Sequence, residues 1–323
     1  MLRQIKNTVR QRLGADSGPY RKQVWCFAGI PAGVSAVLML LNLLSGYIAP
    51  EGGLSNMGTH TMIETGIMLL QVLSGAVLSF WSLGLVYSAL AQLRGEAVDN
   101  RSFTAGLRRF VPVLVSWLLR GLYYTLIVTA CATLSSVAIS MLPLPKSVYE
   151  AANAFLEAPA LPIPGSLLAL CGCYLAIYTV SLGVLLIPVM YLHRLVDYCI
   201  MDDTPVNGLQ SVMISSILMR GNRWKLFRLD LRFWWFYLAE LLVLLLSSVE
   251  LLLPRLLEIL PFGQEVWAWV FPILALLAQT LLYGLAKPRL CLSYAAFYDE
   301  LLRQIKEEKP EEEKPRKKLP WKY

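Results

Sequence analysis

The sequence predicts an all-α protein, a polytopic bundle of about six transmembrane helices with further helices at the cytoplasmic surface of the membrane. Of the 323 residues, 56% are hydrophobic and only 16% are charged, whereas a soluble domain usually has about 25% charged residues. Six apolar stretches each reach the roughly 20 residues that a helix needs to cross a bilayer. Backbone groups inside lipid must form hydrogen bonds within their own segment, so each stretch is predicted to be a helix.

The predicted spans alternate with connecting segments along the chain. The first span is too long for the apolar region of a cleavable signal peptide, which has about 7–15 residues. Leucine-rich runs such as LLVLLL at 241–246 are too apolar for a helix that is half exposed to water. The spans are predicted at residues 24–49, 62–92, 110–142, 165–191, 233–253 and 266–286.

Two terminal segments flank a membrane domain that is predicted at residues 24–303. Residues 1–23 are predicted to form a cytoplasmic interfacial helix, because four apolar residues recur there at helical spacing beside basic residues. These apolar residues are Leu2, Ile5, Val9 and Leu13. Residues 304–323 repeat Glu-Glu-Lys-Pro and cannot bury enough apolar surface to fold alone, so we expect a disordered charged tail.

The positive charges predict the orientation of the bundle. Of the 29 Lys and Arg residues, 26 lie in the terminal segments and in segments 93–109 and 192–232, and only two lie in the other three connecting segments. Lys and Arg are enriched in cytoplasmic loops, so both termini are predicted to be cytoplasmic. Charges beside the membrane also account for the net charge of +7 and favour anionic lipid headgroups over nucleic acid as the partner.

Residues 213–237, MISSILMRGNRWKLFRLDLRFWWFY, are predicted to lead the chain from the membrane surface into the fifth span. A short helix with Thr204 as its N-cap and Pro205 as its first residue should end at Gly221. On the next helix, basic heads can reach phosphates while aromatic rings lie at headgroup level. The residues of this predicted collar are Arg223, Trp224, Lys225, Phe227, Arg228 and Arg232. The collar either only anchors the fifth span or forms a specific site for anionic lipid or a membrane-protein partner.

Two ionisable residues lie inside predicted spans. Arg120 lies about 15 Å along its helix and Glu240 about 12 Å along its own. Both helices are predicted to run outwards from the cytoplasm, so the depths match and an ion pair is geometrically possible. Such a pair is either structural or part of a substrate site. In a third alternative, Arg120 extends to the headgroups.

Patterns typical of catalytic or metal-binding sites are absent from the sequence. It contains no GxxxxGK[ST] phosphate loop, no HExxH and no GxSxG. The six cysteines form no CxxC pair, and the two histidines, His60 and His193, lie in different connecting segments. We therefore predict no cofactor, no metal and no catalytic site.

Two stretches carry a resemblance to a known family. The first lies within residues 216–235 and the second, SYAAFYDELL, covers residues 293–302 with Phe297 and Tyr298 at its centre. The matching residues of the first stretch are Ser216, Leu218, Met219, Gly221, Asn222, Trp224, Phe227, Leu229, Leu231, Phe233 and Trp235. The chain resembles the multi-pass bacterial membrane proteins catalogued as domain of unknown function 975. That resemblance implies a place in the bacterial cytoplasmic membrane and implies no activity, substrate or catalytic residue.

The leading functional hypothesis is a non-enzymatic integral membrane protein that acts through lipid or protein partners. The alternative is a transporter of small molecules or lipids, or a subunit of one. An intramembrane enzyme is least favoured, because no nucleophile–base or metal constellation is visible. A tightly packed apolar bundle with a wide basic collar would favour the partner hypothesis, and buried polar groups around a shared cavity would favour transport.

Overall fold

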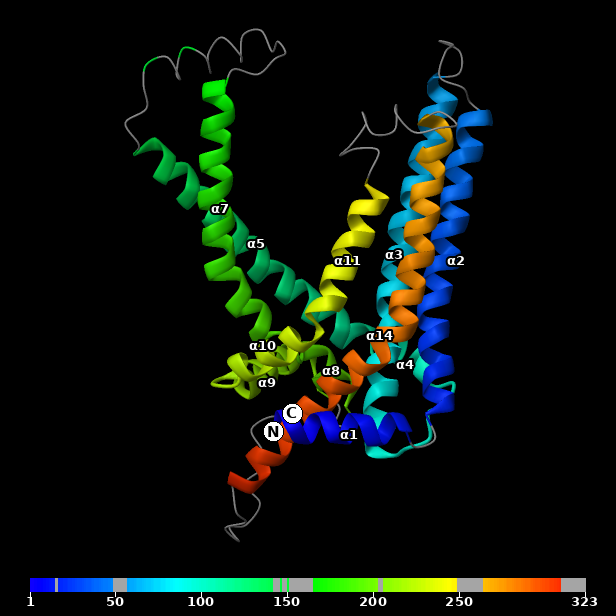
Figure 1. Ribbon diagram of the computed structural model, residues 1–323, viewed down its shortest axis with the longest axis vertical. Coiled ribbons are helices and arrows are strands. Elements are labelled where there is room, and N and C mark those ends of the chain that lie inside the picture. Colours follow the sequence, from blue (N-terminus) through cyan, green and yellow to red (C-terminus); the bar gives the residue numbers. More distant parts are fainter. Residues whose placement is uncertain are drawn as a thin grey trace.

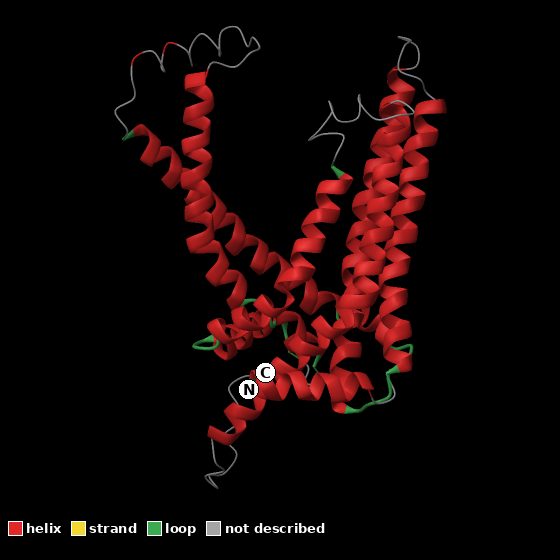
Figure 2. Cartoon of the chain, viewed as in Figure 1, coloured by secondary structure: helices red, strands yellow, loops and turns green. Residues whose placement is uncertain are grey.

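The chain forms long helices that stand on a layer of shorter ones (Figures 1 and 2). The structure is a computed structural model and describes residues 1–14, 17–48, 57–141, 146, 150, 165–202, 206–248 and 264–308. These residues are mostly helical and contain no strand. The predicted all-α class is therefore confirmed.

The long helices make the upright part of the bundle. They are α2 (Gly18–Ile48), α3 (Met57–Arg94), α5 (Phe110–Ser140), α7 (Gly165–Leu192), α11 (Trp234–Ser247) and α14 (Gln264–Glu308). Short helices form what we call the basal layer, together with the last part of α14. They are α1 (Leu2–Gly14), α4 (Ser102–Arg108), α8 (Val196–Met201), α9 (Gly208–Met219), α10 (Arg223–Asp230) and the 3₁₀ turn η1 (Leu231–Phe233).

Five helical stretches among the described residues are long and apolar enough to cross a membrane. At most 22% of the most apolar window in each is buried inside the protein, so most of their side chains face outwards, as contact with lipid requires. The stretches are Gly18–Asn42, Thr61–Arg94, Phe110–Ser140, Leu168–Met201 and Trp269–Ile305. They correspond to the first four predicted spans and to the last one.

The remaining predicted span, residues 233–253, is described only in part. Helix α11 contributes 14 residues, which extend about 21 Å and fall short of the roughly 30 Å of a bilayer core. Residues 249–253 of this span lie outside the described part of the chain. This span, the fifth in chain order, therefore stays a prediction.

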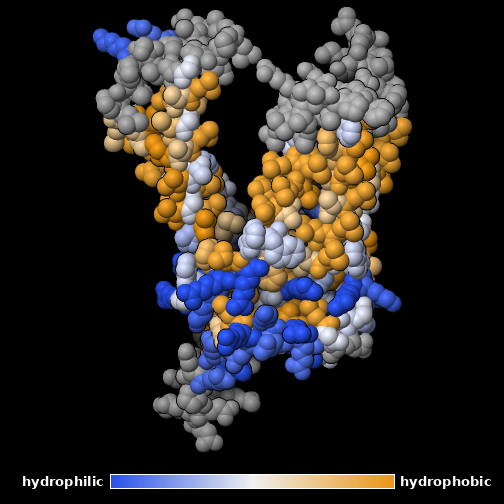
Figure 3. All heavy atoms as spheres, in the orientation of Figure 1, coloured by the Kyte–Doolittle hydropathy of each residue, from blue (hydrophilic) through white to orange (hydrophobic). Residues whose placement is uncertain are grey.

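Most of the buried core lies in the basal layer rather than among the upright helices. Fully buried side chains gather on α8, at the end of α9, on α10 and on the last part of α14. Examples are Leu195, Ile200, Met219, Leu226 and Phe297. The long helices instead expose many leucines, as Figure 3 shows by their hydrophobic surface above a hydrophilic base. The tertiary structure is thus concentrated at one end of the molecule.

Both terminal segments differ from the prediction in one respect. A helix does form near the N-terminus, but its apolar stripe contacts protein, because Ile5 and Val9 are buried and α1 packs along α14. Residues 18–23 belong to α2. At the other end, α14 continues without interruption to Glu308, so residues 304–308 of the predicted tail are helical. Residues 309–323 lie outside the described part.

Helix α9 begins later than predicted. Asn207 precedes its first residue, and the Asn207 N–H donates a hydrogen bond to Gln210 Oε1 at 3.3 Å. Asparagine is a stronger N-cap than threonine, and it replaces Thr204, which lies outside the described residues. The predicted end is confirmed, since α9 stops at Met219 and Gly221 adopts a φ of 82°.

Helices α3 and α4 approach each other at two glycines. A Cβ added at Gly84 would collide with the Ser102 carbonyl oxygen, and one added at Gly106 would collide with the Phe80 carbonyl oxygen. Neither obstacle is the flexible end of a side chain, so the backbones themselves would have to separate.

We expect Gly84→Ala and Gly106→Ala each to destabilise the protein by about 1–3 kcal/mol through overpacking. Gly75→Ala is the matched control, because the same helix has open space around Gly75. The measurement is thermal unfolding of the detergent-purified chain. Equal unfolding temperatures for Gly84→Ala and Gly75→Ala would contradict the close contact.

Candidate functional site

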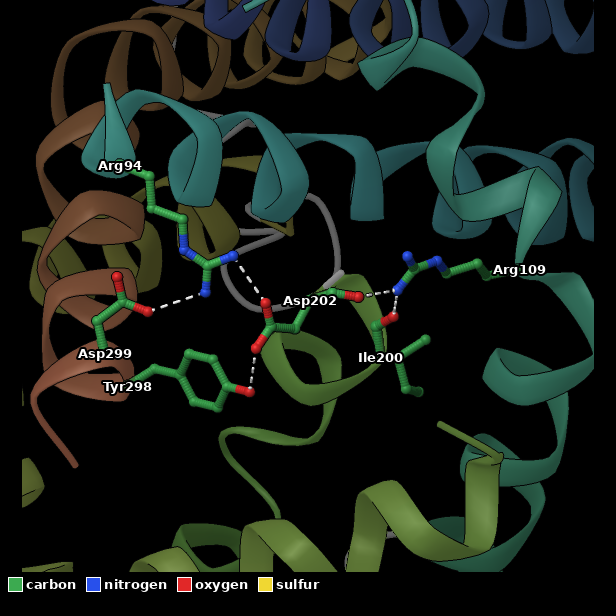
Figure 4. Close-up of polar contacts among 6 residues, drawn as sticks. All are labelled: Arg94, Arg109, Ile200, Asp202, Tyr298 and Asp299. Atoms are coloured by element: carbon green, nitrogen blue, oxygen red, sulfur yellow. Dashed lines mark hydrogen bonds and ion pairs between the residues drawn. The ribbon is translucent and has the colours of Figure 1, made fainter. Parts of the chain in front are cut away.

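An ion network around Asp202, the residue that ends α8, joins α8 to the ends of α3 and α14 (Figure 4). Arg94, at the end of α3, donates to Asp202 Oδ1 at 2.7 Å and to Asp299 Oδ1 of α14 at 3.1 Å. The Tyr298 hydroxyl, also on α14, donates to Asp202 Oδ2 at 2.9 Å. Both oxygens of the Asp202 carboxylate are therefore engaged by other helices.

Arg109, the residue that precedes α5, adds two further hydrogen bonds. Its Nη1 donates to the backbone carbonyls of Ile200 and Asp202 (Figure 4). These carbonyls lie at the end of α8, where a positive charge is favourable for the helix dipole. The groups of this network satisfy one another, which makes it a structural link between α3, α5, α8 and α14.

The predicted ion pair between Arg120 and Glu240 is wrong. Arg120 Nη2 lies 2.8 Å from Asp197 Oδ1, and the side chains of this pair are 14% and 28% exposed. Glu240 lies beside Tyr283 of α14 instead. The physical reason is the helix packing, because α5 packs mainly on α7 and α9, whereas α11 packs mainly on α14.

Five of the six collar residues lie on α10, and the sixth, Arg232, lies on η1. Trp224 stacks on Phe227 with ring centroids 4.9 Å apart, and the Arg228 guanidinium lies 5.7 Å from the centre of the Trp224 ring. Arg223, Trp224, Lys225 and Arg228 are exposed, while Leu226 and Leu229 on the opposite face are buried and anchor the helix. Three basic side chains and Trp224 thus lie on the exposed face of α10, and their contact with lipid headgroups stays a prediction.

Arg232, the remaining collar residue, turns towards α1. Its Nη1 donates to the Leu2 carbonyl at 3.2 Å. There it joins four other basic residues around a cavity of about 590 Å³ between α1, η1 and α14. We call this cavity the basic pocket. Its basic residues are Lys6, Arg10, Arg21, Arg232 and Arg289.

The basic pocket combines positive charge with an apolar floor. Ile5, Val9 and Leu229 contribute buried apolar side chains, and no acidic residue lines the cavity within the described chain. All five basic side chains are exposed, and none forms an ion pair with a described residue. Such a site can accept several negatively charged oxygens together with an apolar group.

Sequence patterns could not reveal the basic pocket, because its charges come from three distant parts of the chain. The basic face of residues 1–13 and the collar were visible separately, but not their contact. Among the described residues there is no group of three His, Cys, Asp or Glu side chains that could hold a metal ion.

No protein-family model matches the chain, and no curated protein or solved structure is similar to it. The resemblance to domain of unknown function 975 therefore stays a prediction.

The Arg120–Asp197 pair predicts a measurable coupling. Arg120→Leu and Asp197→Leu should each destabilise the protein by leaving a partner charge unpaired, and the double variant should recover part of the loss. The coupling free energy should lie in the range of about 0.5–3 kcal/mol that contacting residues show. It is obtained from unfolding of the single and double variants in detergent.

The control cycle combines Arg120→Leu with Glu240→Leu, whose effects should be additive. Coupling in this second cycle, and none between Arg120 and Asp197, would show that the pairing described here does not form.

Proposed function

We propose that this chain is an integral protein of the bacterial cytoplasmic membrane that acts by binding anionic lipid at its basal layer, without catalysing a reaction. The observation that carries the proposal is the basic pocket, in which five basic side chains, none of them paired with an acidic residue in the described part of the chain, surround an apolar floor. Helix α1, which lines this pocket, lies at the foot of the long apolar helices (Figure 1), where lipid headgroups would lie.

The chemistry of the pocket suits a phosphate-bearing headgroup. Four of its five basic residues are arginines, and the planar guanidinium presents paired donors that match phosphate oxygens. The buried apolar residues beneath them can contact the first carbons of an acyl chain. Basic pockets between membrane helices are a known means of holding anionic headgroups.

The outward collar residues have a supporting role in this proposal. Arg223, Lys225 and Arg228 lie on an exposed face, where basic residues attract an anionic membrane surface by about 1 kcal/mol per charge. A non-catalytic role is supported by the partly buried ionic groups around Asp202, because their contacts link helices to one another. A membrane-protein partner would use the same exposed face.

Two variants that each remove three positive charges distinguish specific lipid binding in the basic pocket from general attraction between surface charge and anionic lipid. The pocket variant is Lys6→Gln/Arg10→Gln/Arg289→Gln, and the collar variant is Arg223→Gln/Lys225→Gln/Arg228→Gln. If the pocket is the site, the pocket variant should weaken binding of phosphatidylglycerol at least about tenfold more than the collar variant, a difference of about 1.4 kcal/mol.

The measurement is titration of the purified full chain with short-chain phosphatidylglycerol, followed by native mass spectrometry. Unfolding temperatures establish that both variants are folded. Equal losses in the two variants would mean that surface charge alone attracts the lipid and would overturn the proposed site.

The same proposal places the basal layer in the cytoplasm. Single cysteines are introduced at Lys146 and at Arg101 in a cysteine-free chain, and intact cells are treated with a membrane-impermeant maleimide. The cysteine at position 146 should react, because segment 143–164 is expected outside, whereas the one at exposed Arg101 should react only after lysis. The reverse pattern would contradict this orientation.

A further inference from the structure

A second cavity of about 450 Å³ lies between α7, α10 and α11. We call it the tyrosine pocket. Its polar lining residues are Tyr191, Arg194, Asp230 and Tyr237, and its apolar wall includes Ile187 and Trp234. No residue lines both this cavity and the basic pocket, so the two are separate sites.

The tyrosine pocket holds one positive and one negative charge that do not pair directly. Tyrosine hydroxyls bridge them: Arg194 Nη2 donates to Tyr294 Oη at 3.1 Å, and Tyr294 donates to Asp230 Oδ1. The Tyr191 hydroxyl donates to Asp230 Oδ2 at 2.8 Å, and the Tyr237 and Tyr294 hydroxyls lie 2.9 Å apart. The two charges are thus held in fixed places within one cavity.

Both charged groups keep unused hydrogen-bonding capacity towards the cavity. A guanidinium has five N–H donors, but only Nη2 of Arg194 donates to a described residue. The Arg194 side chain is exposed although its guanidinium lies 5.1 Å from the centre of the Tyr294 ring. A carboxylate has about four acceptor positions, and Asp230 accepts one hydrogen bond at each oxygen.

Above the pocket, two apolar stripes continue along the long helices. On α7, Ile187 is followed by Val184 and Val180 at helical spacing, and all three are exposed. On α11, Trp234 begins a similar exposed stripe that continues through Leu238, Leu241 and Leu245. Figures 1 and 3 show the two helices diverging from the base, with a hydrophobic surface on either side of the open space. A hydrocarbon chain can follow this surface from the pocket.

We propose that the tyrosine pocket binds a phospholipid with a phosphoethanolamine headgroup. Its phosphate accepts hydrogen bonds from the free Nε and Nη1 groups of Arg194, its ammonium donates to Asp230, and one acyl chain lies along the stripes of α7 and α11. The pocket contributes one charge of each sign, which complements a zwitterion, whereas the basic pocket contributes five positive charges.

This arrangement selects among headgroups by their hydrogen-bond donors. A primary ammonium carries three N–H donors, as the Lys side chain does. A choline headgroup carries the same charge but no N–H group. It can therefore contact Arg194 through its phosphate but cannot donate to Asp230. Phosphatidylglycerol places no positive charge beside Asp230 and should be the weaker ligand here.

The test compares phosphatidylethanolamine with phosphatidylcholine, using the full-length chain and native mass spectrometry in a neutral detergent. Wild type should retain phosphatidylethanolamine about tenfold better, the ratio that corresponds to about 1.4 kcal/mol. Asp230→Asn should abolish this preference, and Arg194→Gln should weaken both lipids. Ile187→Trp, which fills the apolar wall and leaves every polar group in place, should also weaken both.

The basic-pocket variant Lys6→Gln/Arg10→Gln/Arg289→Gln is the matched control and should leave phosphatidylethanolamine binding at the tyrosine pocket unchanged. Loss of lipid binding at the basic pocket is thereby distinguished from loss of lipid binding at the tyrosine pocket. Unchanged lipid preference in folded Asp230→Asn, or unchanged retention in Ile187→Trp, would overturn the proposal. A lipid-free dimer as the only species would also overturn it, because a second copy would then cover this surface.

Discussion

Asp202 is the residue on which the arrangement of the basal layer depends. Its carboxylate satisfies Arg94 and Tyr298, and its backbone carbonyl accepts from Arg109. The side chains of Arg94 and Asp202 are 25% and 13% exposed, so water screens the pair only in part, and loss of either partner leaves a charge without compensation. Four helices that are distant in sequence meet in this network. Their relative positions are therefore fixed by electrostatics and hydrogen bonding at one end of the molecule.

A fixed base explains how the long helices can form two groups. Helices α2, α3, α11 and α14 pack against one another, while α5 and α7 pack together, and Figure 1 shows the second group inclined away from the first. In water, such separation would expose apolar surface at a cost of roughly 25 cal/mol per Å². Lipid removes that cost, because hydrocarbon tails are as apolar as leucine. The tyrosine pocket lies where the two groups diverge.

The parts of this structure that depend on local sequence could be predicted, and those that depend on helix neighbours could not. The long helices follow from apolar length alone, and Gly221 ends α9 because a left-handed φ is easy for glycine. The partner of Arg120 requires the rotation and the neighbours of α5, which a single sequence does not contain. A residue count gives a position along each helix but does not indicate which helices are neighbours, and the partner of Arg120, Asp197, lies in a segment that the sequence predicts to be a connecting one.

The positions of the charges also bear on the choice between lipid binding and transport. Arg120 and Glu240 do not face one shared polar cavity, since each has its partner on a different helix, and this removes the strongest sequence-based reason for a substrate path through the bundle. Two cavities that combine charge with apolar walls lie at the base, and a third, of about 290 Å³ between α2, α3 and α14, has Lys287 as its one charged lining residue among the described residues. A ligand with a charged group and an apolar chain can contact both the charged residues and the apolar wall of such a cavity while it stays in the membrane. A lipid meets that requirement, whereas a water-soluble solute would leave the apolar half unoccupied.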